Sequence, residues 1–193
     1  HQLEELALGN LDFAVQLKQP RYGPDFRVES LGRSPLAILL REEHPLTRED
    51  VTWERLVEFP LLKLHVPDRE QLEVQKNASA VRPLVNHPGG MLEMSSLQTA
   101  LAVLRQTEYF MPAPAFLLEQ GRASAGVTGC TMPQGGELDL EYVLVAHKRT
   151  VNSPLHGWLW QQIARVVADM RASPAYARQL RRARSDTAES AAL

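Results

Sequence analysis

The sequence predicts an α/β fold with largely parallel sheets. Short apolar runs of strand length recur along the chain, and segments with a helical spacing of apolar residues separate them. The chain has 193 residues, of which 44% are hydrophobic and 23% charged. This composition is sufficient to bury the core of one domain or of two small ones.

Five elements are expected before residue 60. An amphipathic helix at the N-terminus ends at Gly9, since glycine is the usual residue at a helix C-cap. Three largely apolar stretches predict strands at residues 11–17, 26–31 and 36–40. A short helix around residues 53–57 takes its N-cap from Asp50 or Thr52 and ends before Pro60.

Strands and helices are expected to alternate after residue 60. Strands are expected at residues 61–66, 82–87, 109–111 (which Pro112 ends) and 138–147. Helices are expected at residues 69–80, 97–104 and 116–118. A last helix starts at Ser153 and Pro154, because a serine cap followed by proline is typical of a helix start. Its broad apolar stripe comprises Leu155, Trp158, Leu159, Ile163, Val166, Val167 and Met170.

Composition and motifs argue against several classes of protein. The net charge of −2 provides no field to hold nucleic acid, and no apolar stretch approaches the roughly 18 residues of a membrane span. The single cysteine, Cys130, permits no intrachain disulfide and favours a reducing compartment. Phosphate-binding glycine motifs, a nucleophile elbow and metal-ligand spacings are absent from the sequence. We therefore expect no cofactor, no metal and no catalytic residues. The alternative is an enzyme that uses Cys130 or a carboxylate pair, although no nucleophile–base arrangement is visible in the sequence.

Two features leave a binding role open. Ser95 and Ser96 stand at a helix start after a glycine-containing loop, where hydroxyl and backbone N–H groups can face an anion. The alternative is a plain N-cap that satisfies only its own helix. Four arginines in the C-terminal tail belong either to a solvated helix or to a phosphate contact: Arg178, Arg181, Arg182 and Arg184.

Six motifs, taken in order, resemble the effector-binding domain of LysR-type transcriptional regulators. LGNLDFAV (residues 8–15) is similar to that family's L-x-x-G-x-L-D-x-A-I segment, and REEHPL (41–46) to its strand end followed by His-Pro-Leu. Further similarities lie in LVEFPLL (56–62), MSSLQTALAVL (94–104), FMPAPAFLL (110–118) and HKRTVNSPLHGWLWQQI (147–163). Each motif is weak alone, and their order carries the resemblance.

The resemblance implies an α/β fold of two Rossmann-like subdomains, like that of type 2 periplasmic binding proteins. Two crossover strands, near Pro60–Val66 and Leu140–His147, would join residues 1–59 and 144–193 (subdomain I) to residues 60–143 (subdomain II). A small-molecule effector would bind in the cleft between them. The expected contacts are Ser95, Ser96, Lys63, Leu64 and His65.

The resemblance also implies partners and a location. Such domains form a homodimer or homotetramer in the cytoplasm and reach DNA only through an N-terminal helix-turn-helix domain. That domain, and the family's first strand and helix of the effector domain, would precede residue 1, so we expect a fragment. Asp12 would have a structural role. A two-lobed periplasmic solute-binding protein, monomeric and with the same fold, is the alternative.

One stretch departs from the family pattern. Where the family has a glycine-rich turn before its L-L-P strand end, this chain has Arg105-Gln106-Thr107-Glu108. The bulkier turn predicts a different local loop and a changed cleft shape.

Overall fold

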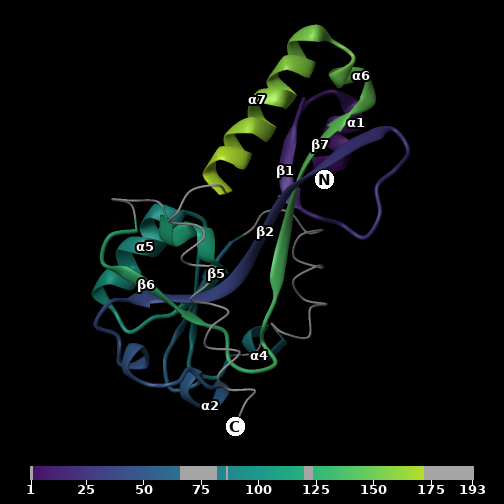
Figure 1. Cartoon of the computed structure of the whole chain (residues 1–193). Helices are drawn as coiled ribbons and strands as arrows, with labels where there is room; N and C mark the ends of the chain where they lie inside the picture. Colours follow the sequence, from purple (N-terminus) through teal and green to yellow (C-terminus); the bar gives the residue numbers. More distant parts are fainter. Residues whose placement is uncertain (1, 66–81, 86, 120–123, 172–193) are drawn as a thin grey trace, which may run out of the picture.

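Two groups of strands share one long strand in the computed structural model (Figure 1), which describes residues 2–65, 82–85, 87–119 and 124–171. The helices are α1 (Gln2–Leu8), η1 (Pro45–Arg48), α2 (Trp53–Leu56), α4 (Arg82–Val85), α5 (Leu97–Gln106), η3 (Ala115–Glu119), α6 (Lys148–Val151) and α7 (Pro154–Arg171). The strands are β1 (Ala14–Leu17), β2 (Phe26–Arg41), β3 (Leu61–Leu64), β4 (Met91–Met94), β5 (Met111–Pro114), β6 (Val127–Thr131) and β7 (Asp139–His147).

The first strand group consists of β1, β7 and residues 26–35 of β2, all antiparallel. In the second strand group, residues 36–41 of β2 lie between β5 and β6, again antiparallel. The parallel pair β3–β4 joins this group through a bridge between Leu61 and Phe110, next to β5. The prediction of largely parallel sheets is therefore wrong for the described residues. Apolar runs that are buried on both faces occur in antiparallel as well as parallel sheets, so the apolar pattern did not discriminate between the two kinds of pairing.

The first crossover strand is β2, and the prediction of a crossover near Pro60–Val66 is wrong. Strand β3 begins there, and it pairs with β4 inside the second strand group. Strand β2 has 16 residues and joins the two strands expected at 26–31 and 36–40. A bulge between Ser30 and Gly32, where Gly32 has a φ of 127°, lets the strand continue through a segment that resembles a turn. The second crossover, expected at 140–147, coincides with β7, which runs beside β2 between the two parts of the molecule (Figure 1).

Local signals at the helix ends are mostly confirmed. Helix α1 ends at Gly9, whose φ is 85°, and the Thr52 hydroxyl rather than Asp50 caps α2 by accepting from the Arg55 N–H. Helix α7 begins at Pro154 as expected. The predicted helix at residues 69–80 and the tail arginines lie outside the described residues.

Two strand predictions failed at prolines. Residues 82–85 form the short helix α4 rather than a strand, and Pro83 in its first turn suits a helix start. Strand β5 continues through Pro112 to Pro114. The two prolines are two residues apart, so both missing N–H groups fall on the same edge of the strand and the other edge keeps its donors.

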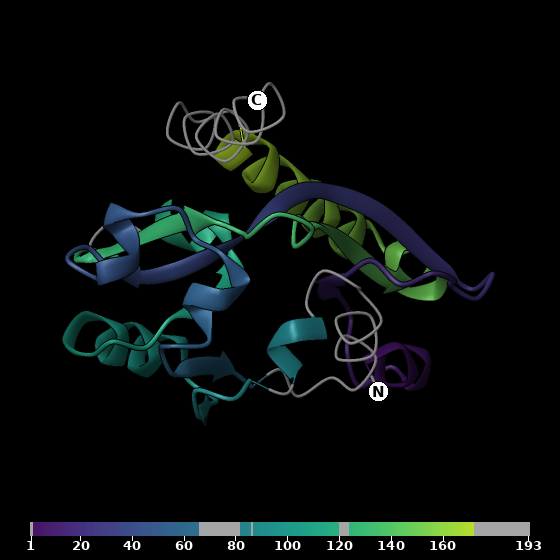
Figure 2. The same ribbon diagram turned by 90° about the horizontal axis from the view of Figure 1, so that it is seen from below.

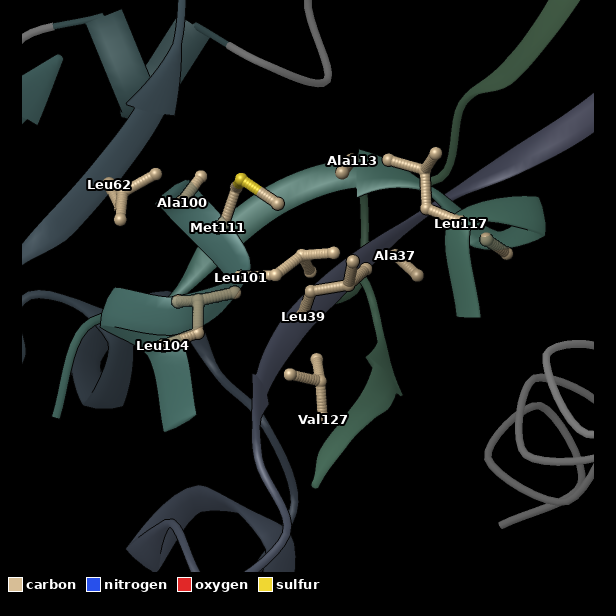
Figure 3. Close-up of a cluster of buried hydrophobic side chains, with 11 residues drawn as sticks. Ala37, Leu39, Leu62, Ala100, Leu101, Leu104, Met111, Ala113, Leu117 and Val127 are labelled. Carbon is tan, nitrogen blue, oxygen red and sulfur yellow. The ribbon is translucent and has the colours of Figure 1, made fainter. Parts of the chain in front are cut away.

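Each strand group has a core on both of its faces. In the second group, Ala37 and Leu39 of β2 pack with α5 in the cluster of Figure 3, whereas Ile38 and Leu40 pack with Leu46, Leu56 and Leu84 from η1, α2 and α4. This alternation explains why the LAILL run is apolar throughout. Figure 2 shows the two parts side by side along β2 and β7.

The first strand group is covered by α1 on one face and α7 on the other. Val143 and Val145 of β7 pack against Leu6, while Leu144 and Ala146 pack against Trp160. Near the start of α7, His156 Nε2 lies 3.5 Å from the Asp12 carboxylate, which links α7 to the segment before β1. That contact agrees with a structural role for Asp12. Within the described part of the chain, the helices include none of the length and hydrophobicity needed to span a membrane.

Candidate functional site

The predicted site residues meet at the carboxyl ends of the parallel strands β3 and β4. The strands pair with Lys63 opposite Glu93 and Leu64 opposite Met94. The backbone N–H of His65 then donates to the Met94 carbonyl, which brings His65 beside Ser95. The carboxyl ends of parallel strands are a common place for ligands in α/β folds.

Charged side chains gather around Glu93. One of its carboxylate oxygens lies 2.6 Å from His65 Nδ1, and the other lies 4.0 Å from Lys63 Nζ. The hydrogen bond with His65, followed by the positive charge of Lys63, holds the pKa of Glu93 below its usual value. Glu93 is therefore ionised at neutral pH. All three side chains are partly exposed, so a ligand can reach them.

The two serines begin the next helix. The Ser96 hydroxyl accepts from the Thr99 N–H at 3.3 Å and caps α5, while the Ser95 side chain has no hydrogen bond among those found in the described residues. Both residues are exposed. The Ser96 hydroxyl therefore caps α5 and still has its own O–H to donate, so both serines present a donor at the surface.

The remaining predicted contact, Leu64, packs against the core cluster beneath α5. Strand alternation places Lys63 and His65 on the opposite face of β3 from Leu62 and Leu64. Leu64 thus packs in the core, on the face of β3 that points away from Lys63 and His65.

Glu93 was not predicted from the sequence. Its signal is the match between LLKL and MLEM, which carry opposite charges at the same position of two strands. That match has meaning only once the strands are known to pair in parallel. The cluster supplies a carboxylate, an ammonium, an imidazole and a hydroxyl, which can recognise polar ligand groups. No group of side chains able to hold a metal ion was found in the described part of the chain.

The fold and this edge define a two-part α/β domain of the kind that binds small molecules. The model of the LysR substrate binding domain matches residues 1–168, and the chain belongs to that family. Its fold is that of type 2 periplasmic binding proteins, and the family membership favours a regulator over the solute-binding alternative.

Solved structures show the same fold. A transcriptional-regulator structure from Vibrio parahaemolyticus is 21% identical, covers 88% of this chain and 77% of that chain, and has a TM-score of 0.65. The regulatory domain of MetR, a LysR-family regulator from N. meningitidis, is 12% identical with coverages of 89% and 75% and a TM-score of 0.64. The regulatory domain of MexT, a transcriptional activator in Pseudomonas aeruginosa, is 15% identical with coverages of 83% and 77% and a TM-score of 0.63. A comparison with curated proteins found no match.

Proposed function

We propose that the chain is the ligand-sensing and oligomerisation domain of a LysR-type transcriptional regulator. The observation that carries the proposal is the polar cluster at the carboxyl ends of β3 and β4, formed in a chain that belongs to the LysR substrate binding domain family. A small polar effector would contact Ser95, Ser96, Lys63 and His65, with Glu93 as an added contact. No catalytic step is needed for this role.

The proposed subdomains differ in their boundary from the sequence expectation. We place subdomain I around the first strand group and subdomain II around the second, so that β2 changes subdomain between Pro35 and Leu36. Residues 36–41 pair with β5 and β6, and Leu46 and Leu56 share a core with Ile38, which supports assigning residues 36–59 to subdomain II.

Replacement of Ser95 tests the effector site. A thermal-shift screen of small carboxylates, amines and sugars should give a ligand, since a ligand at 100 times its Kd stabilises by about 2.7 kcal/mol. We expect Ser95→Ala to weaken the binding of that ligand about two- to tenfold in calorimetry, because one hydrogen bond contributes roughly 0.5–1.5 kcal/mol.

The matched control is Ser153→Ala, at the start of α7 and in the other part of the molecule (Figure 1). It should leave the affinity unchanged. Equal affinity of the parent protein and Ser95→Ala would place the ligand elsewhere.

A homodimer is proposed through the exposed apolar face of α7. Leu155, Trp158, Leu159 and Val166 are 38–68% exposed and recur at helical spacing, while an adjoining face of α7 packs on the sheet through Trp160. A homotetramer would need a second interface in addition to this one. We further propose that contact with DNA is made by a helix-turn-helix domain elsewhere in the regulator and that the regulator acts in the cytoplasm.

A charge introduced on this face should break the dimer. We expect Leu159→Glu to convert a dimer to a monomer in light scattering at a concentration where the parent protein pairs, because a buried unpaired carboxylate is costly. Gln161→Glu adds the same charge at an exposed position outside this apolar face and serves as the control. A dimer that survives Leu159→Glu would require a different interface.

A further inference from the structure

Glu141 of β7 holds three side chains from two other segments. Lys18 Nζ lies 3.2 Å from both carboxylate oxygens, Ser30 Oγ donates at 3.0 Å, and an Arg33 N–H group donates at 3.4 Å. The Glu141 side chain is 17% exposed, whereas those of Lys18 and Arg33 are 52% and 66% exposed. We call these four residues the Glu141 clamp.

The clamp holds β2 on both sides of its bulge. The pairing of β2 with β7 shifts between Ser30, which is opposite Val143, and Gly32, which is opposite Tyr142. Arg33 then lies opposite Glu141 itself. A bulge is a place where a strand bends and twists, and glycine with a positive φ gives little resistance to that bending. One carboxylate bound on both sides of the bulge restrains it.

The clamp also fixes the carboxyl end of β1. Lys18 follows β1 directly, and its backbone N–H donates to the Glu141 carbonyl at 2.8 Å in addition to the side-chain contact. Two residues beyond Arg33, β2 leaves the first strand group at Pro35 and enters the second at Leu36. The clamp therefore lies next to the point where β2 passes from the first strand group to the second.

We propose that the Glu141 clamp sets the relative orientation of the two strand groups by fixing the direction in which β2 and β7 leave the first group. Single exposed ion pairs contribute little, but here one partly buried carboxylate contacts two cations and a hydroxyl around a deformable bulge. An effector that changes this orientation would have to act against the clamp or through it. That signalling role rests on the proposed function, whereas the orientation can be measured without a ligand.

The test measures the distance distribution between spin labels on the two parts by electron–electron double resonance. Labels are placed through Gln161→Cys on α7 and Glu54→Cys on α2, both exposed, in a Cys130→Ser background. We expect Glu141→Gln to broaden the distribution roughly twofold, because release of the clamp admits further orientations. Lys18→Met, which leaves β2 and β7 unchanged, should broaden it in the same direction.

The control is Glu58→Gln, which removes an ion pair with Arg55 inside one part of the molecule and should leave the distribution as in the parent. A distribution that stays unchanged in Glu141→Gln or in Lys18→Met overturns the proposal, as does equal broadening by Glu58→Gln. Circular dichroism shows that each variant is folded, and if Glu141→Gln does not fold, Lys18→Met decides. None of these outcomes depends on whether a ligand binds at Ser95.

Discussion

Replacement of Trp160 by alanine is expected to lower the free energy of unfolding by about 3–5 kcal/mol, the usual cost of removing a large buried aromatic side chain. Trp160 is 1% exposed and packs with Leu31, Leu144 and Ala146 between α7 and the first strand group. The indole N–H donates to the Glu29 carboxylate, and the Arg27 guanidinium lies 4.5 Å from the ring centroid. Alanine would thus leave a cavity and remove the indole N–H that donates to Glu29.

The measurement is urea unfolding followed by far-ultraviolet circular dichroism. The control is Trp158→Ala on the same helix, since Trp158 is 57% exposed and its loss should cost much less in protein too dilute to pair. Similar losses in the two variants would mean that α7 does not pack on the sheet through Trp160.

Helix ends could be predicted from the sequence because their signals act over a few residues. Gly9 lies at the end of α1, Thr52 and Ser96 cap the helices that they precede, and Pro154 begins α7. In each case the side chain, or the lack of one, acts on backbone groups within about one turn. Each of these helix ends can therefore be predicted from the neighbouring residues in the sequence alone.

The long crossover strand could not be predicted in this way, because what determines it is distant in the sequence. Gly32 and Pro35 interrupt the apolar pattern of β2 and suggest a turn. The strand continues because residues 139–147 pair with it across this stretch, more than a hundred residues later in the chain. The same limit applies to the site: Lys63 and Ser95 were predicted, but Glu93 depends on the register between β3 and β4.

The stretch that departs from the family pattern is tied to its surroundings. Arg105 donates to the Ala125 carbonyl at 2.7 Å, and the Glu108 carboxylate pairs with Arg41 at the end of β2. Glu108 also offers its backbone carbonyl to His44, 3.1 Å away. The bulky turn thus acts as a support for the REEHPL segment, with His44 at its centre.

His44 is expected to make the stability of the domain dependent on pH. Its ring is fully buried against Phe59; Nδ1 accepts from the Leu46 N–H at 3.1 Å, which leaves Nε2 to donate to Glu108. Burial, above all, lowers the pKa of His44 below its ordinary value. A proton on Nδ1 would also remove the acceptor of the Leu46 N–H, and an unpaired buried N–H costs about 1–3 kcal/mol.

The direction of the effect follows from the lowered pKa. The unfolded chain takes up a proton on His44 near pH 6.5, before the folded protein does, so this contribution to stability is complete above about pH 6.5 and decreases between that value and the lowered pKa. Urea unfolding at about pH 7.5 and about pH 5.5 should show a smaller loss in His44→Asn than in the parent protein, because asparagine does not titrate. An equal loss in His44→Asn and the parent protein would assign the pH dependence to other groups.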